Sequence, residues 1–231
     1  MSGAAVRAVL LDALGTLVEL SDPAPRLRAA LAADAGVEVD LEAAERAFGA
    51  EIAYYMANQM RGGDRAGLAA LRDDCAEVMR AALVAAAPRA AGIGHAEVRA
   101  AMLAALEFTP YPDVEPALVA LRERGLALVV VSNWDCSLPH WLDRAGVAPL
   151  LDGAVSSAAV GVAKPAAAVF EAGLALAGCT AGEALFVGDS VDNDVEGARA
   201  AGMRGVLVQR DGEPPAGVET VRSLEALTTL L

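Results

Sequence analysis

Three acidic residues could act together although the chain separates them widely. Asp12 directly follows the apolar run AVLL, Asp189 follows the run ALFVG, and Asp194 comes five residues later. Carboxylates that converge at one point repel one another unless a cation shares the site, and hard oxygen ligands favour Mg²⁺. A carboxylate can also attack an electrophilic centre and form a covalent intermediate. These positions therefore indicate metal binding or nucleophilic chemistry.

A single lysine accompanies these acids. The 18 basic residues are all arginine except Lys164. In a chain that uses arginine so freely, the exception favours a position where a compact ammonium is needed and a guanidinium would not fit. The alternative is a chance survivor on a solvated face. We expect Lys164 to neutralise negative charge in a tight pocket.

Short apolar runs must position these residues. Each run ends in a polar or glycine-containing turn, which is typical of a strand buried on both faces. The runs are residues 8–11, 126–131, 153–155, 184–187 and 205–208. Helical patterns lie over residues 116–125, 166–178 and 194–202. This alternation predicts a doubly wound parallel sheet of Rossmann-like topology. Ligands bind beyond the carboxyl ends of such strands, where Asp12, Ser132 and Asp189 all fall.

Residues 22–107 interrupt the alternation. Three amphipathic patterns there predict helices over residues 40–60, 66–87 and 95–106. The sequence therefore predicts an α/β core domain made of residues 1–21 and 108–231. An all-helical domain, residues 22–107, is inserted after the first strand and could cover the strand ends as a lid.

The composition limits the partners. The chain of 231 residues has 31 acidic and 18 basic residues, a formal net charge of −13, so we expect neither nucleic acid nor an anionic membrane as a partner. No apolar run reaches the ~18 residues that a membrane span needs. The three cysteines are widely spaced, without a CxxC pair, which is typical of free thiols in a reducing compartment. We expect a cytoplasmic monomer or homodimer that takes a small anionic substrate.

Four motifs carry a family resemblance. They are DALGTLV at 12–18, Ser132-Asn133, Lys164-Pro165 and GDSVDND at 188–194. Each motif alone is weak, but their order and spacing at predicted strand ends resemble the haloacid dehalogenase (HAD) superfamily of hydrolases. The resemblance covers essentially the whole chain. It implies that the helical insertion is the cap domain found after the first motif in one large subgroup.

The resemblance also implies a role for each matching residue. Asp12 would be the nucleophile that forms an aspartyl intermediate. Lys164 would neutralise charge between the substrate and Asp12. Thr16, Ser132 and Asn133 would bind the transferring phosphoryl group, Ser132 through its hydroxyl and Asn133 through its backbone N–H.

A magnesium site follows from the same resemblance. Asp12, Asp189 and the backbone carbonyl of Leu14 would hold Mg²⁺. Asp194 would orient the water ligands of the metal or Lys164, with Ser190 beside it. Acids in this segment also suit a helix N-terminus, but that alternative does not explain Gly188-Asp189 at the end of a buried strand.

Leu14 departs from the family pattern. Most phosphatases of this superfamily carry Asp at this position, where it protonates the leaving oxygen and later activates water. A leucine can do neither, and the loss of such a group costs on the order of 10²- to 10⁴-fold in rate.

Three functions therefore stay open. The first, which we favour, is a Mg²⁺-dependent phosphatase with another acid, or with an acyl or aryl phosphate substrate whose leaving group needs little protonation. The second is a 2-haloacid dehalogenase, because halide leaves without a proton; those relatives need no magnesium and usually carry Ser or Asn where Gly188-Asp189 stands. The third is a binding or regulatory protein with weakened turnover, against which the retained Asp12, Lys164 and Asp189 argue.

Overall fold

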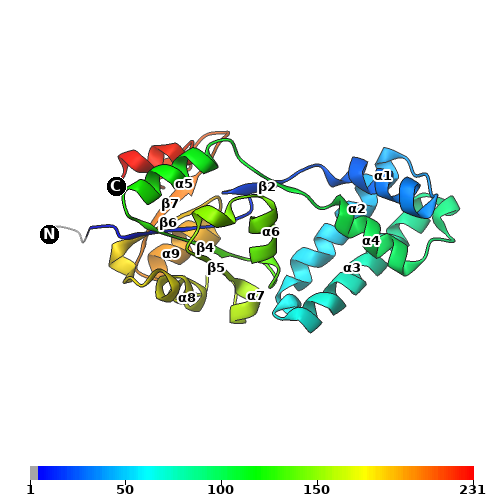
Figure 1. Cartoon of the computed structure of the whole chain (residues 1–231), viewed down its shortest axis with the longest axis horizontal. Coiled ribbons are helices and arrows are strands. Elements are labelled where there is room, and N and C mark those ends of the chain that lie inside the picture. The colour runs from blue at the N-terminus through cyan, green and yellow to red at the C-terminus, as the bar shows by residue number, and fades with distance from the viewer. Residues whose placement is uncertain (1–4) are drawn as a thin grey trace. The chain divides into compact units, whose positions relative to one another are not determined.

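The computed structural model describes residues 5–231, which form two compact units. The first, here called the α/β unit, combines the chain up to Glu19 with Thr109–Leu231. The second, the helical unit, is Leu20–Phe108. The chain passes between them through β2 (Val18–Leu20) and β3 (Phe108–Pro110), which form a two-stranded sheet of their own (Figure 1).

A six-stranded parallel sheet is the centre of the α/β unit. Its strands are β1 (Ala8–Leu11), β4 (Ala127–Ser132), β5 (Gly153–Ser156), β6 (Ala184–Gly188), β7 (Arg204–Val208) and β8 (Thr220–Val221). They lie in the order β5-β4-β1-β6-β7-β8 and every neighbouring pair is parallel. The predicted Rossmann-like fold is confirmed. The two residues of β8 are too few to produce a readable apolar pattern.

Helices cover both faces of this sheet. They are α5 (Val114–Glu123), α6 (Leu138–Arg144), α7 (Ser157–Val160), α8 (Ala167–Ala177) and α9 (Gly197–Ala200). Figure 1 shows α5 and α8 on opposite faces. On the α8 face, Leu10 and Val129 of the sheet pack with Val169 and Phe170, and the Phe170 and Phe186 rings meet edge to face at 5.0 Å. Burial of such side chains is the main force that holds each helix to the sheet.

Short helical turns complete the chain. They are η1 (Gln59–Gly62), η2 (Pro88–Ala90), η3 (Ala148–Leu150), η4 (Ala181–Glu183), η5 (Val191–Glu196) and η6 (Leu224–Thr229). The helical pattern predicted over 194–202 is observed up to Ala200, but the helical segment starts earlier, at Val191, and its first part is the π-helix η5. The Ser190 side chain accepts a hydrogen bond from Asn193 N at the start of η5, at 3.2 Å. Such wide turns are frequent at functional sites.

Four helices pack around one core in the helical unit. They are α1 (Pro23–Ala35), α2 (Leu41–Asn58), α3 (Arg65–Ala86) and α4 (His95–Ala105). Three of them were predicted, whereas α1 was missed because its alanine-rich pattern is weakly amphipathic. Two signals mark it all the same. Asp22 caps the helix ahead of Pro23, and Leu27 and Leu31 are buried four residues apart.

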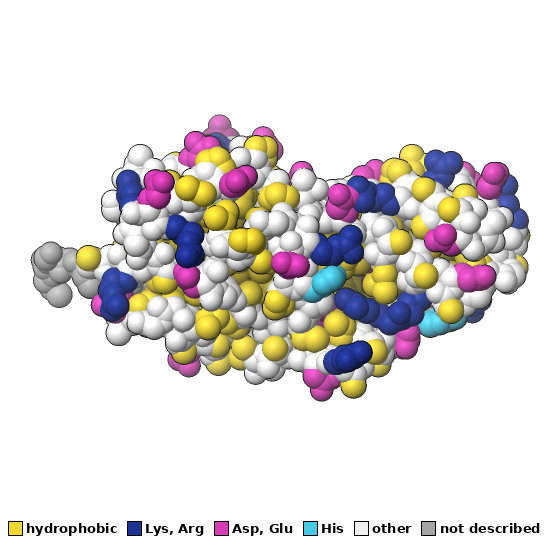
Figure 2. Space-filling model, in the orientation of Figure 1, with side chains coloured by type: hydrophobic (Ala, Val, Ile, Leu, Met, Phe, Trp, Pro, Cys, Tyr) yellow, Lys and Arg dark blue, Asp and Glu magenta, His cyan; other side chains and the backbone are white. Residues whose placement is uncertain are grey.

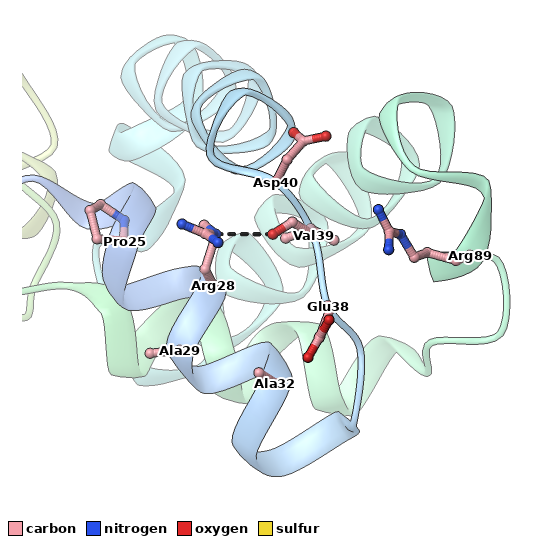
Figure 3. Close-up of a pocket in the computed structure, with 8 residues that line it drawn as sticks. All are labelled: Pro25, Arg28, Ala29, Ala32, Glu38, Val39, Asp40 and Arg89. Atoms are coloured by element: carbon pink, nitrogen blue, oxygen red, sulfur yellow. Dashed lines mark hydrogen bonds between the residues drawn. The ribbon is translucent and has the colours of Figure 1, made fainter.

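A cavity of about 520 Å³ lies in the helical unit between α1 and the segment before α2 (Figure 3). Arg28 donates a hydrogen bond from Nε to the carbonyl of Val39 at 2.9 Å, which ties the two segments together. Arg89 and Glu38 also line the cavity. On the face shown in Figure 2, acidic, basic and apolar side chains are interspersed over each unit. None of the helices of residues 5–231 is long and apolar enough to cross a bilayer.

Gly205 lets η5 pack directly on β7. A Cβ built at this position would lie 2.7 Å from the carbonyl oxygen and 2.9 Å from the Cα of Val195, and backbone atoms cannot turn aside as a side chain can. We predict that Gly205→Ala lowers the free energy of unfolding by about 1–3 kcal/mol. Urea denaturation followed by tryptophan fluorescence measures this for the α/β unit, because Trp134 and Trp141 both lie there.

The matched control is Gly182→Ala in η4, where a Cβ would meet nothing within 4 Å. We expect this variant to stay within about 0.5 kcal/mol of the wild type. Equal effects of the two substitutions would contradict the close approach that we assign to Gly205.

Candidate active site

A buried ammonium joins two carboxylates at the centre of the sheet. Lys164 Nζ donates hydrogen bonds to Asp12 Oδ1 and to Asp194 Oδ1, both at 2.6 Å. The side chains of Lys164, Asp12 and Asp194 are only 2%, 9% and 1% exposed. Charged hydrogen bonds of this length are strong, and removing one partner would leave the others uncompensated. The chain separates Lys164 from Asp12 by 152 positions, so the sheet must bring them together.

The register of the parallel strands explains how Asp12 arrives there. Leu11 pairs with Val130 on one side and with Val187 on the other, so three strands end at the same edge. The next residue, Asp12, donates its backbone N–H to the Val187 carbonyl at 2.9 Å. The acid therefore follows the central strand of the sheet without a flexible connection.

Asn133 holds the segment that carries the lysine. Its side-chain oxygen accepts a hydrogen bond from Lys164 N at 2.8 Å, and its Nδ2 donates to the Lys164 carbonyl at 3.2 Å. This clasp is a function of Asn133 that sequence reasoning missed, since the prediction concerned only its backbone N–H. No local sequence pattern predicts this pair of hydrogen bonds, because it joins positions 31 residues apart.

Asp189 completes a group of three acids. Carboxylate oxygens of Asp12, Asp189 and Asp194 lie within 4.8 Å of one another. Asp189 is exposed as a residue, whereas the other two acids are buried. Oxygen donors at this spacing fit a hard divalent cation such as Mg²⁺.

Two glycines make room for these carboxylates. A Cβ at Gly188 would lie 2.2 Å from Asp194 Cγ, and a Cβ at Gly15 would lie 2.1 Å from Asp189 Oδ2. Gly15 also has a φ of +83°, which closes the turn after β1 and which other residues rarely adopt. Steric overlap with a carboxylate therefore explains why both acidic motifs contain a glycine at these positions.

The electrostatics of the group favour an added positive charge. Three carboxylates face one ammonium, so full ionisation leaves two net negative charges. Burial alone would lower the pKa of Lys164, but Asp12 and Asp194 outweigh it and hold that pKa above its ordinary value. Partial burial of the carboxyl group, together with the charges of Asp12 and Asp194, raises the pKa of Asp189 to about 6. Burial and the charge of Asp12 likewise raise the pKa of Asp194.

The other residues predicted for the site differ in their burial and in their contacts with the acids. Thr16 is fully buried in the turn after Asp12, and its Oγ1 has no hydrogen-bond partner among residues 5–231. Ser132 is buried at the end of β4, beside β1, and within residues 5–231 its side chain makes no hydrogen bond to Asp12, Asp189 or Asp194. Ser190 donates its backbone N–H to Asp194 Oδ2 at 2.9 Å. The Leu14 side chain is among the exposed apolar groups, with the residue 40% accessible.

A family model described as haloacid dehalogenase-like hydrolase matches residues 6–202. The chain belongs to this hydrolase family. The matched range runs from before β1 to the residues after α9 and includes Asp12, Lys164 and Asp189. The resemblance that the four sequence motifs carry is therefore confirmed.

Solved HAD structures share the fold. An HAD phosphatase from Thermococcus onnurineus has a TM-score of 0.66 at 23% identity, and a 2-haloacid dehalogenase from Pseudomonas syringae pv. Tomato has 0.67 at 22%. Each comparison covers 97% of this chain and 97% of the other. Because phosphatases and dehalogenases match equally well, the fold does not distinguish the two reactions.

Curated relatives carry phosphatase names. Phosphatase MT3486 of Mycobacterium tuberculosis is 40% identical over 123 residues, which are 52% of this chain and 55% of that protein. Phosphoserine phosphatase of Thermus thermophilus is 39% identical over 105 residues, which are 45% of this chain and 42% of that protein. The chain thus spans about half the length of the curated relatives it matches.

The shared lysine makes a stability prediction possible. In the presence of chelator, Lys164→Met should lower the free energy of unfolding by about 3–5 kcal/mol, because it leaves buried acids without a counter-charge. Adding Asp194→Asn to that variant should restore part of the loss, since one buried charge is then removed. Urea denaturation of the single and double variants measures both effects.

Arg199→Met is the control, because Arg199 forms an exposed ion pair with Glu196 at 2.7 Å. Exposed pairs contribute little, about 1 kcal/mol at most. If Lys164→Met costs no more than this control, the lysine does not balance the acids as we describe.

Proposed function

We propose that this chain is a Mg²⁺-dependent phosphatase that hydrolyses a small phosphorylated metabolite through an aspartyl-phosphate intermediate on Asp12. The observation that carries the proposal is the buried Lys164 ammonium shared by Asp12 and Asp194, with Asp189 beside them. Relatives named phosphatase support the same reaction class.

In the first step a carboxylate oxygen of Asp12 attacks the phosphorus. The bond from phosphorus to the leaving-group oxygen breaks, and that oxygen takes the electron pair. Lys164 holds Oδ1 of Asp12, which fixes the carboxylate's orientation, and its positive charge offsets part of the negative charge that the phosphoryl group brings. The fixed nucleophile avoids much of the entropic cost of a bimolecular reaction.

In the second step water attacks the phosphorus of the aspartyl phosphate. The bond from phosphorus to the Asp12 oxygen breaks, inorganic phosphate leaves, and the carboxylate is regenerated. A mixed anhydride is reactive enough that this route divides one difficult displacement into two easier ones. Thr16 Oγ1 is buried and has no hydrogen-bond partner among residues 5–231, so it could bind a phosphoryl oxygen only if the turn after Asp12 rearranged.

Asp12, Asp189 and the backbone carbonyl of Leu14 are the groups that we propose for the magnesium ion. Their all-oxygen donor set and the surplus of two negative charges fit such a cation. When bound, Mg²⁺ would help to neutralise the charge that spreads over the phosphoryl oxygens in the transition state.

Leu14 narrows the substrate class. It cannot protonate a leaving oxygen. Two other buried acids of the α/β unit, Asp194 and Asp135, already have hydrogen-bond partners. Asp194 bonds Lys164, and Asp135 accepts from the backbone and hydroxyl of Ser137 at 2.7 and 2.5 Å. We therefore propose a substrate whose leaving group departs readily as an anion, such as an acyl or aryl phosphate.

A 2-haloacid dehalogenase is the second candidate, and Leu14 is the observation that favours it. A halide needs no proton, so a leucine at this position costs that reaction nothing. Against it stands the group of three acids, whose surplus charge would repel a carboxylate substrate unless a cation were present.

The chain order suggests a role for the helical unit, and the cysteines suggest a cellular compartment. We propose that the helical unit, inserted between β1 and β4, acts as the cap that admits substrate and excludes water. We propose a reducing, cytoplasmic compartment, which is consistent with the absence of a disulfide among Cys75, Cys136 and Cys179.

The two candidate reactions differ in product and metal requirement. We expect the purified chain to release phosphate from p-nitrophenyl phosphate with Mg²⁺ and to lose this activity with EDTA. Asp12→Asn should abolish the reaction because an amide is a poor nucleophile, whereas the exposed Asp143→Asn should not change it. Chloride release from 2-chloropropionate that resists EDTA would instead establish the dehalogenase.

The missing acid makes the rate depend on the leaving group. We expect kcat/KM to fall steeply along a series of aryl and alkyl phosphates as the leaving-group pKa rises. Leu14→Asp should flatten this dependence and raise turnover of the alkyl phosphates, on the order of 10²-fold or more. Leu14→Asn should not show this gain in turnover, because asparagine is close to aspartate in volume but has no carboxyl proton to donate. A flat dependence in the wild type would indicate that another residue supplies the proton.

A further inference from the structure

Arg210 bonds the turn that follows the nucleophile. It lies two residues beyond β7, and it reaches back across the unit to residues about 195 positions earlier. Its Nη1 donates to the carbonyl of Gly15 at 3.1 Å, and its Nη2 donates to the carbonyl of Thr16 at 3.0 Å. The planar guanidinium thus fixes two successive peptide groups, which a single ammonium could not match in geometry.

Two further residues hold Arg210 in place. Asp113 accepts from Nη2 at 2.9 and 3.2 Å through its two carboxylate oxygens, and it also accepts from the backbone N–H of Leu224 at 2.7 Å. The guanidinium carbon lies 3.7 Å from the ring centroid of Tyr111, so the group stacks on an aromatic face. The side chains of Arg210 and Asp113 are only 22% and 14% exposed.

The bonded turn packs directly against a candidate metal ligand. Within the turn, the N–H groups of Leu17 and Val18 both donate to the Ala13 carbonyl, at 2.8 and 2.9 Å. A Cβ at Gly15 would overlap the Asp189 carboxylate, with 2.6 Å to its Cγ, so the Gly15 backbone touches that group. A shift of the turn by a fraction of an ångström would therefore change the space that Asp189 occupies.

We propose that Arg210, anchored by Asp113, is a positioning residue that holds the Leu14–Thr16 turn against Asp189 and so sets the affinity of the site for its cation. The inference rests on the proposed function, because it concerns the same magnesium site. Within residues 5–231, Arg210 forms no hydrogen bond or ion pair with the three site acids or with Lys164. It acts on the site through the backbone carbonyls of Gly15 and Thr16.

The test compares Arg210→Gln and Arg210→Lys with the wild type. Titration calorimetry with MgCl₂ and no substrate gives the Kd for Mg²⁺ directly. Residues that orient metal ligands typically change affinity by 10- to 100-fold when replaced. We expect the Kd to rise by about tenfold or more in Arg210→Gln. Arg210→Lys should rescue little, since one ammonium cannot bond both carbonyls. Amide hydrogen exchange of residues 14–18 in the metal-free chain should also become faster.

Arg204→Gln is a matched control in β7, the strand that precedes Arg210. Arg204, at the start of β7, pairs with the carboxylate of Glu219 and donates to the Leu230 carbonyl at 3.1 Å, so it makes the same kinds of bond far from the turn. We expect Arg204→Gln to keep the wild-type Kd for Mg²⁺ even if it lowers the melting temperature. This comparison separates positioning from a general loss of stability.

The outcomes are distinguishable. A folded Arg210→Gln with wild-type Mg²⁺ affinity and unchanged exchange in the turn would overturn the inference alone. A wild-type chain that binds no Mg²⁺ would overturn the proposed metal site and this inference with it. If Arg210→Gln does not fold, Asp113→Asn weakens the anchor while Arg210 remains, and Glu219→Gln is its control. The inference is supported if Asp113→Asn raises the Kd for Mg²⁺, by less than tenfold, and Glu219→Gln does not. It is overturned if the Kd values of Asp113→Asn and Glu219→Gln are the same.

Discussion

The structure of the site depends on one buried ammonium that is shared between two carboxylates. Lys164 holds Asp12 and Asp194 at 2.6 Å each, and a third acid, Asp189, lies close enough to repel both. Burying so much charge is unfavourable unless every partner is placed accurately. A strand of the sheet and hydrogen bonds to the backbone place these partners accurately. Asp12 extends the central strand, Asn133 clasps the backbone of Lys164 from both sides, and Ser190 donates to Asp194.

Close approach of the backbone also lets the acids come together. Where a carboxylate approaches the chain, the sequence has a glycine: Gly15 against Asp189 and Gly188 against Asp194. Gly205 does the same one layer out, where η5 lies on β7. Each glycine costs conformational entropy on folding, on the order of 0.5–1 kcal/mol relative to alanine. A Cβ at Gly15 or Gly188 would displace a carboxylate, and a Cβ at Gly205 would displace the backbone of Val195.

The sequence predicted the sheet and its acids well and the connections between them poorly. Buried parallel strands such as β1 and β6 produce continuous apolar runs, and a parallel sheet places their ends at one edge, so Asp12 and Asp189 could be assigned to one site. The helix α1 was missed because its burial depends on tertiary contacts of Leu27 and Leu31 rather than on a strong periodic pattern. The clasp of Asn133 and the bonds of Arg210 join residues far apart in the chain, which no local pattern encodes.

Leu14 and the charge surplus together constrain the chemistry more than either does alone. In the proposed reaction the acids and lysine would supply a fixed nucleophile and a place for a cation, whereas the position from which a proton would be delivered carries an exposed apolar side chain. Stabilising charge on the phosphoryl oxygens lowers the barrier for any leaving group, but protonation matters only for poor ones. A site built this way keeps its advantage for anhydrides and aryl esters and loses it for alkyl esters. Specificity for the leaving group can thus arise from the loss of a catalytic group, without any pocket that recognises the leaving group itself.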